Sequence, residues 1–413
     1  MPGDHDTIQA AVDAAAPGDL VLVEPGVYPE SVAVETADLT IRGTDRNEVV
    51  LDGGFELDTG IRVVGADGVA IENMTARSYT SNGFFWTGVV GYRASYVTTY
   101  RIGAYGIYAF DAIEGLIEHS YASGSPDGGI YIGQCFPCDT VVDDVLAEHN
   151  GLGYTGTNAG GDLYVVNSTF RNNRVGIMPN SGSYELCFPQ RGATVAGNYV
   201  HANNQPDTPA TRSALRNMGS GIVVYGGRDN VVMRNLVRGH DGIGIGLLSR
   251  LEEDPNAPIP SEGAERPCRE SREDPPVDPS DIPASLVWDA RGNRVVENMV
   301  ADSGIADIAV ATFDADPAGL GNCFGDNRFT SSAPAGLEAL EPCDRPGSGN
   351  WSAGALDLAA LLGQERPAEG DYTTTPVPAP QPEMPDADTA PVRLASEGPP
   401  AIDLDTIDLP DGL

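Results

Sequence analysis

Lysine is absent from this chain, so all 24 of its strongly basic side chains are arginines. No lysine can therefore act as a catalytic base or form a Schiff base with a carbonyl substrate. Apolar runs long enough to cross a bilayer are absent too, and we expect no membrane span. The first residues, Met1 to Asp4, have neither the basic nor the apolar segment of an export signal. We expect that such a signal has been removed from this chain.

Positive charge is scarce overall, because 60 acidic residues face those 24 arginines and the formal net charge is −36. Nucleic acids and anionic membrane surfaces would be repelled, so both are excluded as partners. Acidic polymers such as pectin or alginate are disfavoured unless bound Ca²⁺ or a local arginine cluster bridges the charges. Ca²⁺ is the one cofactor that the sequence suggests. The simplest interpretation is a charge that keeps an extracellular protein soluble.

The chain does contain a repeated pattern. Gly60-Ile61-Arg62-Val63-Val64 returns as Gly106-Ile107-Tyr108-Ala109-Phe110 and again as Gly221-Ile222-Val223-Val224-Tyr225. Gly60, Gly83 and Gly106 are spaced by 23 residues (83 − 60 and 106 − 83). A period in the twenties, with short alternating apolar segments and Gly, Asn or Asp at the corners, is typical of a solenoid.

Each period holds three short strand patterns and no helical pattern, which predicts a right-handed parallel β-helix. Equivalent residues of successive coils then lie roughly 4.8 Å apart. Alternation places one apolar column inside: Ile61, Phe84, Ile107, Ile130 and Ile177. A second column is predicted to point inward at a tight corner and to form a hydrogen-bonded ladder. It consists of Asn73, His119, Asp144, Asn167, Asn198, Asn235, Asn298 and Asn327.

On these repeats the chain resembles the pectin-lyase-like right-handed β-helix superfamily, particularly secreted bacterial proteins with generic β-helix repeats. The resemblance covers roughly residues 6 to 330 and includes the opening segment from Thr7 to Tyr28, which is similar to that family's capping helix and first strand. The superfamily includes polysaccharide lyases, glycoside hydrolases, sugar epimerases, phage tailspikes and copper-accessory proteins. The resemblance therefore implies an all-β solenoid more firmly than any activity.

The predicted organisation has four parts: a cap helix and first strands (1–35), the β-helix (36–330), a C-terminal cap (331–365) and a tail rich in Pro and Asp (366–413). The cap helix is expected over residues 7–16, with Asp6 or Thr7 as its N-cap and Pro17-Gly18 as its stop. A second short helix, Leu356–Leu362, is expected to close the C-terminal end. The tail is either a linker or a strap lying against the solenoid.

One outer face of the solenoid is predicted to be aromatic. Arg62, Phe85, Tyr108 and Tyr131 should point outward from successive coils, with Met178 further along. Flat rings suit stacking on the C–H faces of sugars, and tyrosine hydroxyls can bond ring substituents. The alternative is an aromatic ladder that stabilises the sheet or lies under a loop.

Three coils carry insertions directly after the strand of this face: Gln134–Asp139, Asn180–Gly192 and Arg250–Ser285. Because one corner repeats in space, these loops should stack into a wall beside the aromatic face. The six cysteines, Cys135, Cys138, Cys187, Cys268, Cys323 and Cys343, are an even number and suit an oxidising compartment.

Two interpretations of the cysteines stay open. The first four could ligate a metal. In an exported chain disulfides are favoured: sequence proximity then pairs Cys135 with Cys138 and Cys323 with Cys343, and the stacked insertions favour Cys187–Cys268. The predicted location is secreted or cell-surface.

Polar side chains mark the turn that leads back to the aromatic strand. Asp127 and His149 lie on adjacent coils, and His240-Asp241 follows further along. A carboxylate that orients an imidazole would make a general base. The alternative is a solvated turn with an asparagine ladder. His149 and His240 are three coils apart, roughly 14 Å, so one metal ion with bonds of about 2 Å cannot reach both.

Signature motifs of pectate lyases, polygalacturonases and alginate epimerases are missing from the sequence. We therefore keep two functional hypotheses. The first is a secreted carbohydrate-active enzyme, a lyase, hydrolase or epimerase, with its cleft along the aromatic face. The second is a non-catalytic extracellular β-helix that binds a glycan or another protein. A maturation factor for a metalloprotein is a third, weaker option.

Overall fold

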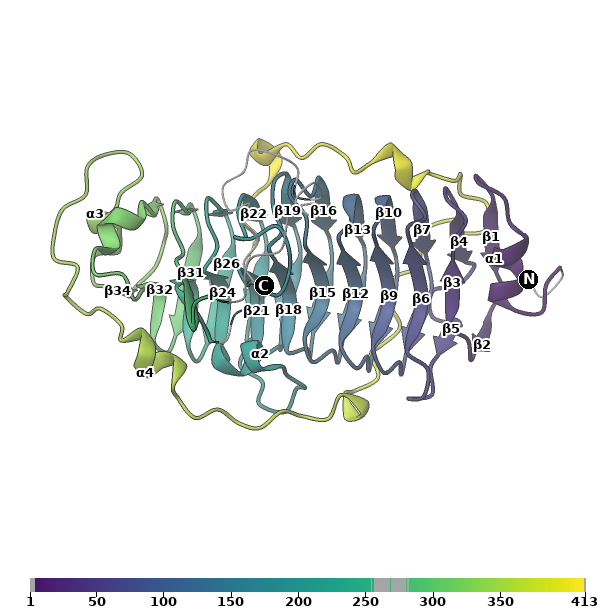
Figure 1. The fold of residues 1–413 in the computed structure, drawn as a ribbon, viewed down its shortest axis with the longest axis horizontal. Helices are drawn as coiled ribbons and strands as arrows, with labels where there is room; N and C mark the ends of the chain where they lie inside the picture. The colour runs from purple at the N-terminus through teal and green to yellow at the C-terminus, as the bar shows by residue number, and fades with distance from the viewer. Residues whose placement is uncertain (1–3, 254, 256–267, 269–279, 281, 412–413) are drawn as a thin grey trace.

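A computed structural model describes residues 4–253, 255, 268, 280 and 282–411. It confirms the all-β prediction, because three long parallel sheets wind around one axis (Figure 1). Sheets A and C each contain 11 strands and sheet B contains 10. No described helix has the length and apolar character needed to cross a bilayer.

The strands take their places in the order in which the chain visits the sheets. Sheet A contains β1 (Leu20–Val23), β4 (Thr40–Gly43), β7 (Val69–Glu72), β10 (Val90–Ser95), β13 (Ile113–Glu118), β16 (Thr140–Asp143), β19 (Leu163–Val166), β22 (Ala193–Ala196), β25 (Val231–Met233), β30 (Arg294–Val296) and β33 (Cys323–Gly325). Sheet B contains β2 (Gly26–Tyr28), β5 (Val49–Asp52), β8 (Thr75–Arg77), β11 (Thr98–Tyr100), β14 (Tyr121–Ser123), β17 (Leu146–Glu148), β20 (Thr169–Arg171), β23 (Tyr199–His201), β26 (Leu236–His240) and β31 (Met299–Ser303).

Sheet C carries the predicted aromatic face. It contains β3 (Val32–Val34), β6 (Thr59–Val64), β9 (Asn82–Thr87), β12 (Tyr105–Phe110), β15 (Gly128–Gly133), β18 (Leu152–Thr157), β21 (Val175–Asn180), β24 (Ser220–Tyr225), β27 (Ile243–Leu248), β32 (Ala306–Ala311) and β34 (Ser332–Ala333). A separate antiparallel hairpin pairs β28 (Arg250–Glu253) with β29 (Ser285–Trp288).

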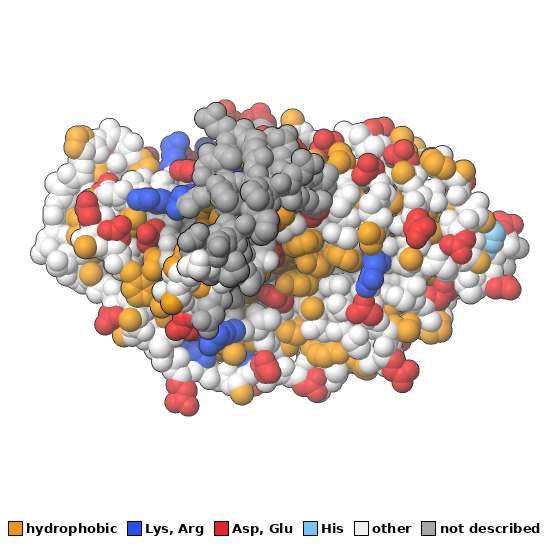
Figure 2. Space-filling view, viewed as in Figure 1, with side chains coloured by type: hydrophobic (Ala, Val, Ile, Leu, Met, Phe, Trp, Pro, Cys, Tyr) orange, Lys and Arg blue, Asp and Glu red, His pale blue; other side chains and the backbone are white. Residues whose placement is uncertain are grey.

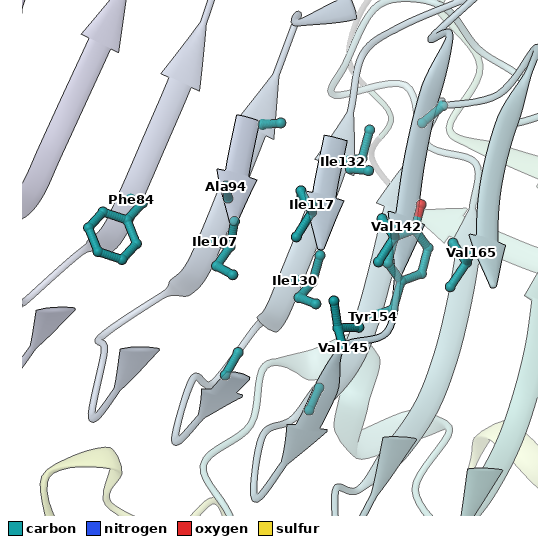
Figure 3. Close-up of a cluster of buried hydrophobic side chains, with 14 of the residues drawn as sticks. Phe84, Ala94, Ile107, Ile117, Ile130, Ile132, Val142, Val145, Tyr154 and Val165 are labelled. Atoms are coloured by element: carbon teal, nitrogen blue, oxygen red, sulfur yellow. The ribbon is translucent and has the colours of Figure 1, made fainter. Parts of the chain in front are cut away.

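The core lies between the three sheets. The predicted inner column is buried without exception, since Ile61, Phe84, Ile107, Ile130 and Ile177 are all 0% exposed. Figure 3 shows how Ile107 and Ile130 of sheet C face Ile117 and Val142 of sheet A across the interior. Stacking such columns buries the apolar side of every coil, which no coil could do alone.

The predicted corner ladder is correct in half of its members. Asn198, Asn235 and Asn298 each donate through side-chain and backbone amides to the Asn of the next coil at 2.9–3.0 Å, and Asn327 is the last acceptor. The other four members do not point inward as predicted. They are Asn73, His119, Asp144 and Asn167.

The error is a shift of one residue, and its cause is the left-handed backbone at the corner. The first residue of the corner has a positive φ, which turns its side chain outward. His119, Asp144 and Asn167 are such residues. The following residue faces inward, as Ser120 and Ser168 do. Where the second corner residue is Asn the ladder forms, and where the first is Asn it does not.

The two ends of the solenoid are closed by short helices. α1 (Ile8–Ala14) begins after the N-cap Thr7 and buries Ile8, Ala11 and Val12, as the sequence predicts. At the other end, α3 (Leu337–Leu340) places Leu337 and Leu340 in the main core. The predicted second cap, found as α4 (Leu358–Leu362), lies elsewhere: Leu358 and Leu361 pack with Ala309 on the outer side of sheet C.

The tail runs back along the outside of the solenoid (Figure 1). Three short 3₁₀ turns interrupt it: η4 (Tyr372–Thr374), η5 (Ala395–Glu397) and η6 (Leu404–Thr406); another, η3 (Pro317–Leu320), precedes the last coil. The backbone carbonyl groups of the tail accept hydrogen bonds from six arginines of the coils: Arg42, Arg46, Arg93, Arg101, Arg174 and Arg234. We call residues 366–411 the strap.

Candidate functional site

The strands of sheet C align the predicted aromatic residues on one outer face. The parallel register pairs Arg62 with Phe85, Phe85 with Tyr108, and Tyr108 with Tyr131. Apolar side chains gather over the middle strands of this sheet (Figure 2). Tyr105, three residues before Tyr108 on the same strand β12, joins them.

The rings on this face stack on one another. The centroids of Phe85 and Tyr108 are 4.8 Å apart with 14° between the planes, and those of Tyr105 and Tyr108 are 4.4 Å apart with 19°. Phe85 and Tyr105 make no ring contact with each other, so they cover opposite faces of Tyr108. A sugar on this surface would meet ring edges and hydroxyl groups rather than a set of open faces.

Tyr131 is not exposed as predicted. It is 2% exposed because the insertion after β21 lies over it, and its hydroxyl donates to Glu185 of that insertion. The T-shaped contact between Tyr131 and Tyr108, at 5.0 Å, carries the aromatic surface inward under the loop. Arg62 sits at the opposite, exposed end of the row and is paired with Asp58 at 2.5 Å.

The insertions do form the predicted wall, as far as the structure describes them. Ser183 donates its backbone N–H to both carboxylate oxygens of Glu252. Leu186 donates its N–H to the Gln134 side chain at 2.8 Å, and Cys268 donates its N–H to the Phe136 carbonyl at 2.9 Å. All three predicted disulfides are present: Cys135–Cys138, Cys187–Cys268 and Cys323–Cys343. This pairing overturns the alternative in which these cysteines bind a metal.

A cavity of about 200 Å³ opens between this wall and the opposite edge of sheet C. Its far side is the insertion of residues 202–219 with the short helix α2 (Arg212–Arg216), which we did not predict from the sequence. Asp127 and Tyr105 lie on that side, and Tyr184 and Arg250 lie on the wall side. The cavity therefore lies between a loop that precedes a strand of sheet C, residues 202–219, and the insertions that follow strands of the same sheet.

Two carboxyl groups meet tyrosines here. Asp127 accepts a hydrogen bond from the Tyr105 hydroxyl at 2.6 Å, and Glu185 accepts one from Tyr131. Burial, with a smaller contribution from the nearby charge of Asp127, raises the pKa of Glu185 to about 8 against the opposing hydrogen bond from Tyr131. Burial likewise raises the pKa of Asp127, while its hydrogen bond from Tyr105 works in the opposite direction. Glu185 is thus protonated at neutral pH.

One oxygen of Glu185 is unused. Oε2 is buried and has no hydrogen-bond partner among the described residues. Arg250 lies beside the same loop: it donates to Asn180 Oδ1 at 3.0 Å and to the Ser181 carbonyl, and its guanidinium is 5.2 Å from the Tyr184 ring centre. The cavity is therefore lined by one carboxyl group, Asp127, and by two cations, Arg212 and Arg250, while Glu185 is bonded to the lining residue Tyr131.

The other predicted polar residues do not join this site. Asp127 and His149 form no hydrogen bond or ion pair; the left-handed backbone of His149, with φ 61°, directs it away from the strand that follows. His240 is buried inside the coil, where Asn203 Nδ2 lies 3.2 Å from its Nε2. It ends an inner ladder of Asn150, Asn173 and Asn203, and burial lowers its pKa to about 3. Asp241 is exposed at the same corner.

Sequence reasoning missed Glu185, Tyr184, Arg250 and Tyr105 as site residues. A signal for the far loop did exist, because 18 residues (202–219) separate β23 from β24, against three (172–174) between β20 and β21. Nothing in the repeat singles out Glu185, which lies in a loop without periodicity. Among the described residues, no three His, Cys, Asp or Glu side chains are grouped as a metal site would need.

Comparisons with known proteins agree with this architecture. The family model of the right-handed beta helix region matches residues 59–252. No curated protein matches the chain. Among solved structures, the A-module of mannuronan C-5 epimerase AlgE4 from Azotobacter vinelandii is similar at 16% identity and TM-score 0.46, covering 82% of this chain and 93% of its own.

Two further solved structures are similar to the same degree. An alginate lyase, AlyF-OU02, shares 13% identity at TM-score 0.42, over 88% of this chain and 92% of that one. PfbA, a surface adhesin of Streptococcus pneumoniae, shares 10% identity at TM-score 0.46, over 79% and 89%. Identities this low speak to the fold alone. With its matched coil region, three parallel sheets and capping helix, the chain is a right-handed parallel β-helix protein.

Proposed function

We propose that this protein is an exported carbohydrate-active enzyme that binds a polysaccharide along the outer face of sheet C and cleaves it in the cavity above Asp127. The observation that supports the proposal is the neighbourhood of two carboxyl groups, of which Glu185 keeps its proton at neutral pH and has an unpartnered oxygen. Three disulfides favour an oxidising compartment outside the cytosol.

The chemistry we assign is glycoside hydrolysis. Glycosidases use one carboxylic acid to protonate the leaving oxygen and one carboxylate to activate water or attack the sugar. Glu185 is the acid, because its raised pKa leaves it protonated where the reaction runs. Asp127 is the second carboxyl group, oriented by Tyr105. Tyr108 packs against the lining residues Tyr105 and Tyr131, and we assign its edge and hydroxyl to a neighbouring sugar unit.

Two observations support other outcomes. Arg250 could neutralise a uronate carboxylate, which is the requirement of a lyase or an epimerase. Both carboxyl groups are already bonded to tyrosines and the cavity is small, which suits a glycan-binding protein without turnover. The glycan is the partner in every one of these cases.

The test is incubation with a panel of neutral and acidic polysaccharides, following reducing ends and, separately, the absorbance of unsaturated products. Hydrolysis releases reducing ends without absorbance. Glu185→Gln should lower the rate by 10²–10⁴-fold, the typical contribution of a general acid. Glu114→Gln, on sheet A, is the matched control and should leave it unchanged.

Each result separates the alternatives. The appearance of unsaturated products would show that the enzyme is a lyase and not a hydrolase. Retention of the protein on a glycan array with no products in either assay would leave binding alone. Full activity in Glu185→Gln would remove that residue from the mechanism.

A further inference from the structure

A second, larger cavity lies at the corner between sheets A and B, away from sheet C. Its volume is about 460 Å³, which is within the range of small-molecule sites. Its walls come from the corner residues, from the outer side chains of β17 and β20, and from the strap residues Gln381 and Pro382. The reaction proposed above uses none of these groups.

The floor of this cavity is apolar and aromatic. Val145 and Leu146 line it, and the rings of Tyr96 and His119 lie 4.6 Å apart with 32° between their planes. Both ring residues have left-handed backbones, with φ 53° and 48°, and this conformation turns their side chains outward. His119 belongs to the corner column that the sequence had placed inside, whereas Tyr96 was not part of that prediction.

Charged groups stand around this floor in pairs. His119 Nδ1 is 2.6 Å from Asp144 Oδ2, and Arg171 Nε donates to Glu148 Oε2 at 2.7 Å. The side chains of His119, Asp144 and Arg171 are 37%, 68% and 39% exposed, so each keeps hydrogen-bonding capacity toward the cavity. Each of the two exposed basic side chains, His119 and Arg171, therefore has a carboxylate as its partner.

The strap forms a fixed wall. Arg46, buried and 1% exposed, reaches across two coils and donates to Val97 O, Thr98 Oγ1 and Pro382 O at 2.7–2.8 Å. Asn47 and Gln381 exchange two hydrogen bonds, of 3.0 and 2.8 Å. The wall is therefore held by the coils themselves, and the cavity has its shape before any ligand binds.

These features narrow the ligand's chemistry. An apolar molecule would desolvate the paired charges without replacing their bonds to water. An anion or a cation would compete with an existing pair and meet a like charge. A neutral sugar suits both parts of the cavity. Its C–H faces can pack on Tyr96 and Leu146, and its hydroxyl groups can bond the exposed carboxylate and guanidinium groups of the rim.

We infer that this corner is an accessory binding site for a neutral sugar unit, separate from the cavity over sheet C. The site requires no turnover, so its existence is independent of the proposed function. In an enzyme it would hold a glycan chain at a second point, and in a binding protein it would add a second contact.

The experiment is saturation-transfer NMR on the full chain with D-glucose, D-galactose, D-mannose and D-glucuronate as probes. The key variant is Tyr96→Asn with His119→Asn, since Asn tolerates the left-handed backbone at both positions. Asp144→Asn is a milder variant at an exposed position, and it should weaken binding roughly tenfold through one lost charge-assisted hydrogen bond. Glu185→Gln is the control that alters only the other site.

The expected result is saturation of at least one neutral sugar by the wild-type protein and by Glu185→Gln, lost in the double variant and weakened in Asp144→Asn, with unchanged melting temperatures. Silence with every neutral sugar would overturn the inference. So would signals that persist in the double variant, which would place the binding elsewhere, or binding of D-glucuronate alone, which would contradict the paired rim.

Discussion

Glu185 and His240 are both ionisable side chains that the fold keeps neutral, and burial is the cause in each case. They differ in surroundings. Glu185 lies in a loop over sheet C with an oxygen that lacks a partner, whereas His240 is the last member of an inner ladder. The pH dependence of stability should therefore show two opposite contributions.

Glu185 should make the protein less stable as pH rises. Its pKa is near 4.5 when unfolded and about 8 when folded, so between these values the folded state holds a proton that the unfolded state has lost. The free energy of unfolding then falls with pH by about 1.4 kcal/mol per unit, or about 3 kcal/mol by pH 7. Glu185→Gln should remove this fall.

Thermal unfolding from pH 5 to pH 9 measures the effect, with Glu114→Gln as the control that keeps the wild-type slope. A variant Glu185→Gln with the same slope as the wild type would show that this carboxyl group titrates normally.

His240 should destabilise the protein on the acid side. Its pKa is 6.5 when unfolded and about 3 when folded, so below pH 6.5 only the unfolded state gains the proton. At pH 5 the loss is about 2 kcal/mol. His240→Asn continues the ladder from Asn203 with a group that does not titrate. Its melting temperature should fall less than that of the wild type between pH 7 and pH 5; an equal fall would contradict the assignment.

At the scale of elements, the strands and the N-terminal cap of the solenoid were predictable, because the strands follow the repeat and the cap helix carries a recognisable N-cap and stop signal. Ile61 to Ile177 recur in one phase, and Thr7 begins α1 where an N-cap is expected. The disulfides were predictable because insertions at one corner must stack. The position of α4 was not, since an apolar run such as Leu358–Leu362 fits an end cap and an outer sheet face equally well.

The site was predictable only in its location. Register alone places Phe85, Tyr108 and Tyr131 in a row, but the burial of Tyr131 depends on the course of a loop without repeat. His119 and His240 were misplaced because a shift of one residue at a left-handed corner exchanges inside for outside. Glu185 has no sequence signal, because its pKa depends first on its burial and then on Tyr131 and Asp127 in other coils.

The Cys187–Cys268 bridge is expected to hold the wall rather than the solenoid. It joins residues 81 apart in sequence and fixes the loop that carries Tyr184 and Glu185. Replacing both cysteines by serine should leave the far-UV circular dichroism of the three sheets unchanged and weaken glycan retention or turnover at least tenfold. Serine replacement of Cys323 and Cys343, which lie outside the wall, is the matched control. Equal losses in both variants would contradict a local role.

At the scale of the whole molecule, the strap connects coils that are far apart along the solenoid. It passes toward the N-terminal coils, where Arg46 and Arg42 bond Pro382 and Ala390, and returns along sheet A to Arg234. There Ile407, 6% exposed, covers an apolar patch on the outer face of sheet A formed by Leu116, Val141, Val166 and Ala196. Arginine bonds to carbonyls hold its path, and Ile407 contributes the burial.

Ile407→Asp should therefore release the end of the strap. Placing a carboxylate on that patch without a partner is expected to cost about 2–4 kcal/mol, close to the loss for deleting a buried aliphatic side chain. The variant should be cleaved by trypsin after Arg393 at lower protease concentration than the wild type, while the coils stay resistant, and peptide mass spectrometry locates the cut. Val377→Asp is the control, because Val377 lies on the same strap but is 60% exposed. Equal protection of all three proteins would mean that the arginine contacts alone hold the strap, and Ile407 would then contribute no measurable part of its attachment.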